Sequence, residues 1–141
     1  MRIFTRERTV IGGVFEDLYD VELLWKLTEP LGVEYRSLSE FKNAFHVKCW
    51  SEKDDEGRET FLAPCEVVLS PGAHSYHYEK ITSAKLKYPI LVTATIEPMV
   101  IDGMHRLCKA EMSKWQMLPV KFVDSPMLEK ALISSRFYAT I

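Results

Sequence analysis

Apolar and polar positions along the chain follow two different spacings, which separate the expected strands from the expected helices. Residues 9–15 form a short apolar run that predicts an extended strand. A helix over residues 21–28 is expected next, because Asp20 is a good N-terminal cap and the apolar residues behind it recur at helical spacing. A second short helix is expected from Ser39, a capping residue that is followed by aromatic residues at helical spacing.

The middle of the chain holds a charged turn between two short apolar runs. Residues 46–50 and 60–64 flank the segment 51–59, in which acidic and basic residues surround a glycine. This pattern predicts a hairpin with a solvated loop. Directly after it, residues 66–70 form a run with two valines before Pro71, which predicts a further strand.

The back half begins with an expected helix over residues 76–86, for which Ser75 is a suitable cap. Two β-branched runs, residues 90–94 and 98–102, then predict two neighbouring strands. At Gly103 the spacing of the apolar residues changes from two to between three and four. This change predicts a helix of about 12 residues.

The last part of the chain adds a strand over residues 119–123 and a final helix that opens at Ser125 or Pro126. No repeat, low-complexity tract or long linker interrupts the sequence. We therefore expect an α/β (α+β) fold, in which residues 1–141 form a single domain with a mixed sheet and helices.

Composition agrees with an ordinary globular domain, since 47% of the 141 residues are apolar and 27% are charged. The cysteines at positions 49, 65 and 108 show no zinc-ligand spacing and cannot all pair, which favours free thiols in a reducing compartment. No segment has the apolar length of a signal peptide or a membrane span. The expected location is therefore the cytoplasm, with no membrane partner.

Charge is distributed unevenly along the chain. The formal net charge is −2, far from the basic balance of a non-specific nucleic-acid binder. Residues 16–66 carry 13 acids and six bases, whereas residues 67–141 carry nine bases and six acids. An anionic ligand is therefore expected to bind the second half of the chain.

The candidate chemistry lies where the strand 98–102 runs into the helix that follows. The first backbone N–H groups of a helix lack partners and carry partial positive charge, so they favour an anion. His105 and Arg106 add side-chain donors in the same turn, and Asp102 could hold a divalent cation or accept a proton. The alternative is a plain helix start, in which Asp102 is a cap and the two basic residues are solvated.

The segment from Asp102 to Arg106, with its surroundings, resembles the ParB/sulfiredoxin superfamily. Members share a strand ending in a proline-containing loop, a helix, a strand that opens with Pro-Ile, a second strand, and a Gly-x-His-Arg or Gly-x-Arg-Arg turn that starts a helix. The matching pieces span residues 65–124, with residues 1–60 as an N-terminal extension packed on this core. The Asp-Gly-x-His-Arg form is similar to that of the free-serine kinases in the superfamily.

This resemblance implies a nucleotide site. Gly103, Met104, His105 and Arg106 would hold the phosphates of ATP or another nucleoside triphosphate, with Asp102 and Mg²⁺ beside the transferred phosphoryl group. Activities in the superfamily include phosphoryl transfer to a small hydroxyl, phosphorylation of sulfinic acid, CTP-gated DNA clamping and nuclease activity. Met104 stands where sulfiredoxins have cysteine, which removes their thiol chemistry. The fold alone does not choose among the remaining reactions.

The loop before the helix 76–86 is the expected acceptor side of this site. The free-serine kinases place a histidine and a glutamate after the loop proline, whereas here Pro71 is followed by Gly-Ala-His-Ser. His74 can take the place of the histidine, and the glutamate has no match. Ser75 and His77 complete the expected substrate contacts, with a helix cap and an exposed histidine as the plain alternatives.

The expected function is an ATP-dependent phosphotransferase that acts on a hydroxyl group of a small molecule or of a hydroxylated base in nucleic acid. Its catalytic residues would be Asp102, His105, Arg106 and His74. Replacing Asp102 or Arg106 by alanine should then abolish turnover and leave the thermal midpoint nearly unchanged. The alternatives are a non-catalytic nucleotide- or DNA-binding module, and a nuclease with Asp102 and Glu111 as metal ligands.

Overall fold

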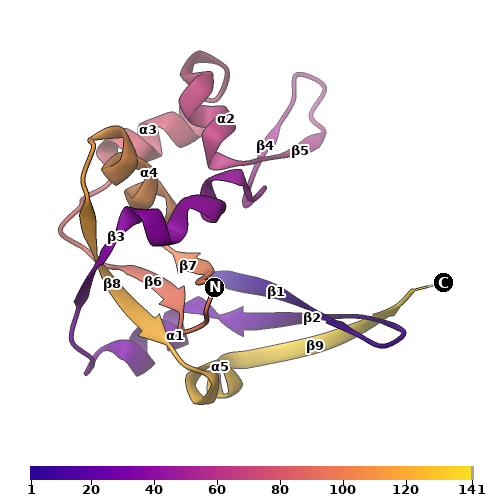
Figure 1. Cartoon of the computed structure of the whole chain (residues 1–141). Coiled ribbons are helices and arrows are strands. Elements are labelled where there is room, and N and C mark those ends of the chain that lie inside the picture. The colour runs from indigo at the N-terminus through magenta and orange to yellow at the C-terminus, as the bar shows by residue number, and fades with distance from the viewer. Residues whose placement is uncertain (141) are drawn as a thin grey trace.

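The computed structural model describes residues 1–140 and has an α/β fold with three antiparallel or mixed sheets and five α-helices in that range (Figure 1). The strands are β1 (Ile3–Val10), β2 (Gly13–Asp20), β3 (Glu34–Ser37), β4 (Trp50–Lys53), β5 (Glu59–Leu62), β6 (Ile90–Thr93), β7 (Val100–Asp102), β8 (Met117–Val123) and β9 (Leu132–Ala139). The α-helices are α1 (Val21–Thr28), α2 (Pro64–Leu69), α3 (Ser75–Ser83), α4 (Met104–Met112) and α5 (Ser125–Ala131). Two 3₁₀ segments, η1 (Leu38–His46) and η2 (Pro71–Ala73), complete the list. The expected fold class is confirmed.

The central sheet has the strand order β3-β8-β6-β7. β6 runs parallel to β8, and the other two pairs are antiparallel. All four residues of β6 are buried, because helices cover both faces of the sheet. On one face, η1 and α4 enclose a core that includes Phe41, Ile90 and Leu107.

The opposite face of the central sheet packs against α1 and α5. Its core joins Leu24, Leu91 and Val123 to Phe4 and Tyr19, which come from β1 and β2. These two strands and β9 form an antiparallel sheet in the order β1-β2-β9. In Figure 1 this sheet extends as an arm from the side of the body. The shared core therefore anchors the base of the arm to the central sheet.

A third layer forms from α2, α3 and the β4–β5 hairpin, which meet α4 around Val67, Ile81 and Cys108. The expected hairpin is confirmed, but its paired strands are residues 50–53 and 59–62, so the charged turn is shorter than the expected segment 51–59. This layer places residues from the first half of the chain next to the start of α4.

The strand expected over residues 66–70 is wrong, because these residues belong to α2. Pro64 occupies the first turn of this helix, and the Glu66 carboxylate accepts a 2.6 Å hydrogen bond from the Ala63 N–H, which closes the helix start. Two valines in a short run resembled a strand, but Val67 is buried on one helix side and its neighbour Val68 is exposed. The capping contacts at the start of this segment therefore favoured a helix over a strand.

Other boundaries also differ from expectation. The strand expected over residues 9–15 is interrupted by the two-residue turn between β1 and β2, where Gly12 has a φ of 89°. The helix expected from residue 76 begins at Ser75, with His74 in the cap position. The expected last helix ends at Ala131, and the chain continues as β9. Asp20 caps α1 as expected, since its carboxylate accepts the Leu23 N–H.

Within residues 1–140, none of the helices has the length and apolar character needed to span a membrane.

Candidate functional site

The turn between β7 and α4 is built on Gly103. This residue has a φ of 102°, a region that side chains rarely adopt, and it is the N-terminal cap of α4. A Cβ atom at this position would lie 2.7 Å from the Ile90 Cγ2 atom, so the glycine also packs directly against the central strand. The sequence DGMHR therefore folds into a sharp strand-to-helix turn, as expected.

The start of α4 has free backbone donors. The first hydrogen bond of the helix runs from the Leu107 N–H to the Gly103 carbonyl at 3.0 Å, and no side chain caps this end. The N–H groups of Met104, His105 and Arg106 precede that bond and have no acceptor within the helix. An anion at this end would accept hydrogen bonds from these N–H groups and would be attracted by the positive end of the helix dipole.

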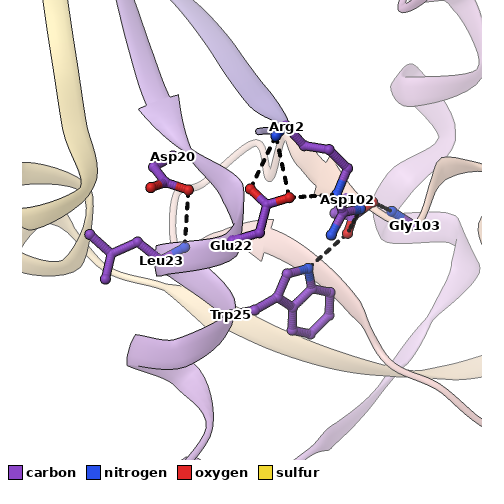
Figure 2. Close-up of polar contacts among 7 residues, drawn as sticks. All are labelled: Arg2, Asp20, Glu22, Leu23, Trp25, Asp102 and Gly103. Atoms are coloured by element: carbon purple, nitrogen blue, oxygen red, sulfur yellow. Dashed lines mark hydrogen bonds and ion pairs between the residues drawn. The ribbon is translucent and has the colours of Figure 1, made fainter.

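Asp102 is the hub of a polar cluster that joins β7 to the N-terminal part of the chain (Figure 2). Its carboxylate accepts hydrogen bonds from the Arg2 guanidinium at 2.6 Å and from the Trp25 indole N–H at 2.7 Å, both on Oδ2. Its Oδ1 accepts the Gly103 N–H at 2.9 Å. Arg2 also donates to Glu22 in α1. Asp102 therefore ties the arm, α1 and β7 together.

This arrangement does not fit a magnesium ion on Asp102. Each carboxylate oxygen already accepts a donor, and the cation beside Oδ2 is Arg2. Within residues 1–140, no group of three or more His, Cys, Asp or Glu side chains is arranged to hold a metal. Glu111, the second acid considered for a nuclease, is exposed near the far end of α4, about 10 Å along the helix axis from Met104 at its start. The two carboxylates therefore cannot share an ion.

Arg106 is half-buried, and its guanidinium donates to the Pro89 carbonyl. Burial lowers the pKa of this guanidinium, with Asp102 opposing that shift. An anion bound at the start of α4 would offset the cost of keeping this charge away from water.

His105 and His77 form a flat pair on one face of Trp50. The indole lies 4.4 Å from the His105 ring and 4.6 Å from the His77 ring, with all three rings within 12° of parallel. Because the two imidazole centroids are only 5.5 Å apart, both rings lie on the same side of the indole. His77 Nδ1 and His105 Nε2 are 3.2 Å apart and share a hydrogen bond. The three stacked rings of Trp50, His77 and His105, called the platform below, connect β4, α3 and α4.

The proton positions in the pair follow from its neighbours. His77 Nε2 lies 3.1 Å from the Ser51 carbonyl oxygen, which can only accept, so this nitrogen donates. His77 Nδ1 and His105 Nε2 share the one proton of their hydrogen bond. Burial, together with His77, Lys80 and Arg106, lowers the pKa of His105 to about 4. The His105 Nε2 atom is thus occupied by His77, and the backbone N–H of His105 is its donor at the start of α4.

We expect the His105→Phe variant to lose part of the acid sensitivity of the fold. An unfolded histidine titrates near 6.5, whereas folded His105 has a pKa of about 4, so the unfolded chain binds more protons and stability falls as the pH drops from 6.5 to 4. Phenylalanine keeps an aromatic ring against Trp50 and does not titrate. The loss of unfolding free energy between pH 6.5 and pH 4 should therefore be about 2 kcal/mol smaller in this variant.

Urea unfolding at several pH values measures this difference. The control is His46→Phe, since His46 is exposed. The same pH slope in wild type and His105→Phe would show that His105 does not titrate as described.

A second titratable pair lies beside the platform. His74 Nδ1 is 2.5 Å from the Glu52 carboxylate, and both side chains are about four-fifths buried. Glu52 comes from β4, directly after Ser51, which bonds to His77. The carboxylate thus holds the imidazole by one nitrogen and leaves Nε2 for another partner.

Two functional candidates were missed by the sequence, namely Glu52 and Trp50. Glu52 stands in an acidic and basic run that is typical of a solvated turn, and Trp50 looks like an ordinary core residue. Only the pairing of β4 with β5 and the packing of that hairpin on α3 bring them to His74 and His105. No local spacing signals this contact.

The remaining expected residues have different positions. His77 is only 5% exposed, so it is not the exposed histidine of the plain alternative, and its ring lies beside that of His105. Ser75 is exposed in the first turn of α3, next to His74. A surface cavity of about 440 Å³ is lined by Tyr76, Glu79, Lys80, Thr82 and Ser83, all from α3, and not by the turn at Gly103.

Comparisons of this chain with protein-family models, with curated proteins and with solved structures found no match.

Proposed function

We propose that this protein is a nucleotide-dependent phosphotransferase that transfers a phosphoryl group to a hydroxyl acceptor. The observation that carries the proposal is the His74–Glu52 pair, which is linked through Ser51 and His77 to His105 in the uncapped first turn of α4. The hydrogen bonds between His77 and Ser51 and between His105 and His77 connect the two places. A candidate base and a candidate phosphate site therefore share one end of the molecule.

The phosphate side of the proposed site consists mainly of backbone donors. The N–H groups of Met104, His105 and Arg106 would bind phosphate oxygens, and the half-buried Arg106 charge would stabilise them. Lys80 on α3 adds positive charge near His105. These residues fit a nucleotide phosphate, which would supply the transferable phosphoryl group.

The acceptor side would use His74 as the base. Glu52 holds His74 Nδ1–H, so the free Nε2 lone pair can accept the proton of an acceptor hydroxyl. The hydroxyl oxygen then bonds to phosphorus as the bond between phosphorus and the leaving oxygen breaks, and the proton stays on His74. Because Asp102 is already bonded to Arg2 and Trp25, we derive no step through a magnesium ion.

The resemblance to the ParB/sulfiredoxin superfamily supports this proposal at the turn from Asp102 to Arg106, although the strand expected before Pro71 is the helix α2. Its free-serine kinases carry a histidine and a glutamate after the loop proline, whereas this chain has His74 alone in that loop. Glu52 from β4 stands beside His74 and offers the missing carboxylate from a different element.

A second candidate is a nucleotide-binding module without catalysis. One observation favours it, namely that Asp102 is occupied by structural partners and leaves no acid free at the phosphate turn. Both functions use the start of α4, but only the phosphotransferase needs the His74–Glu52 pair.

The experiment separates binding from transfer. Calorimetric titration with ATP and ADP, with and without Mg²⁺, should show binding in the wild type and at least tenfold weaker binding in Arg106→Met. Arg136→Met on the exposed arm is the matched control. Glu52→Gln should bind the nucleotide normally and lose about 10²-fold or more in phosphoryl transfer to serine-like hydroxyls or hydroxymethylated DNA.

The control for Glu52→Gln is Glu56→Gln, which changes an exposed acid in the same hairpin. Nucleotide binding without transfer to any acceptor would favour the non-catalytic module. Absence of binding to both nucleotides would exclude both functions for adenine nucleotides.

A further inference from the structure

The outer edge of β9 is open. β9 is the last strand of the arm sheet, and within residues 1–140 no strand pairs with its far side. All eight of its residues are exposed, and four of them are large apolar residues, namely Leu132, Ile133, Phe137 and Tyr138. Arg136 is the single charged residue of this strand. Edge strands of this length normally carry charges or proline that prevent pairing with another chain.

The opposite edge of the same sheet has that protection. β1 carries Arg6, Glu7 and Arg8 among its eight residues. The two edges therefore differ in chemistry, and β9 is the one suited to accept another strand.

The direction of the main-chain groups on β9 follows from one hydrogen bond. The Thr140 N–H donates to the Gly12 carbonyl at 3.0 Å, and the pairing of β9 with β2 continues in the same register from Ala139 back to Ser134. In an antiparallel ladder, bonded and non-bonded pairs alternate. Residues 134, 136 and 138 therefore bond to β2, and the N–H and C=O groups of residues 135, 137 and 139 point outward.

We propose that β9 pairs with β9 of a second copy of this chain, antiparallel and around a twofold axis at Ser135. The two arm sheets would then form one continuous six-stranded sheet. A twofold contact of this kind uses the same strand on both copies and closes after two chains.

The register follows from which groups point outward and from the side chains. Only residues whose N–H and C=O groups point outward can bond across the contact, and these residues have odd numbers. Paired residue numbers therefore add up to an even number. An axis at Ser135 places Ser134 opposite Arg136 of the second copy, and Ile133 opposite its Phe137. Leu132 then lies opposite Tyr138, so apolar residues face apolar residues. An axis at Arg136 would also let residues 135 and 137 pair, but it would bring the two Arg136 side chains together.

This contact is small. The regular ladder of β9 runs only from Ala139 back to Ser134, and Ile133 is the extra residue of a bulge beyond it. The dimer is therefore expected to be weak and to depend on concentration.

The test is sedimentation equilibrium of the whole chain over a range of concentrations, with charge variants at Ser134. Ser134→Lys places a lysine opposite Arg136 of the second copy twice per dimer, and should weaken dimerisation at least tenfold. Ser134→Glu places a carboxylate there and should strengthen dimerisation several-fold. Both effects should shrink at high salt, since these charges are exposed.

The matched controls are Thr5→Lys and Thr5→Glu. Thr5 is exposed on β1 and faces Leu18 of β2 from the other side, just as Ser134 does. These variants should leave the dimerisation constant unchanged. A chain that stays monomeric at about 1 mM, or grows beyond two copies, overturns the proposal. A dimer with the same constant in both Ser134 variants overturns this register.

Discussion

Replacing Gly103 by alanine is expected to destabilise the fold by about 3 kcal/mol. Part of this cost is conformational, because φ at Gly103 is 102° and a side chain in this region costs roughly 1–2 kcal/mol. The rest comes from packing, since the new Cβ would lie 2.7 Å from Ile90 Cγ2 and 3.1 Å from the Ile90 Cα. Ile90 is fully buried in β6 and has little freedom to move.

Two other glycines separate these causes. Gly12 has a φ of 89° with nothing within 4 Å of its Cβ position, so Gly12→Ala should cost only about 1 kcal/mol. Gly72 has an ordinary φ and the same open surroundings, so Gly72→Ala should change stability by less than about 0.5 kcal/mol. Urea unfolding of the three variants measures the series. Equal losses for Gly103→Ala and Gly12→Ala would show that Ile90 yields to the added carbon.

Features that depend on a few adjacent residues were predictable from the sequence. The cap at Asp20, the hairpin around residues 51–59 and the turn at Gly103 are all set by local backbone chemistry. The change in the spacing of apolar residues at Gly103 also predicted correctly that a strand, β7, leads into a helix, α4.

Contacts between distant segments were not predictable in this way. Asp102 was expected to face a cation, but Arg2 and Trp25 reach it from 100 and 77 residues away. The His74–Glu52 pair depends on how the β4–β5 hairpin packs on α3. No strand was predicted from the sequence after the last helix, because the pairing of β9 with β2 joins two distant parts of the chain and leaves no trace in the local pattern.

Replacing Asp102 by alanine is expected to lower the free energy of unfolding by about 2–3 kcal/mol. The change removes the acceptor for the Arg2 guanidinium, the Trp25 indole N–H and the Gly103 N–H at once. The indole N–H is partly buried, so it cannot fully recover a partner from water. For a chain of this size the thermal midpoint should fall by about 8 °C. The contacts of Asp102 thus change the prediction made from the sequence, which was that this variant would leave the thermal midpoint nearly unchanged.

Arg2→Met removes the ion pairs of Arg2 with Asp102 and with Glu22, and it leaves the other two donors to Asp102 in place. The Arg2 side chain is 56% exposed, so its salt bridge should contribute less than about 1 kcal/mol. The difference between Asp102→Ala and Arg2→Met then measures the two neutral donors. Thermal unfolding and nucleotide titration should be run on the same samples, because a stabilising Asp102 predicts a lower midpoint with nucleotide affinity retained below that midpoint. An unchanged midpoint together with lost turnover would instead assign Asp102 to the reaction itself.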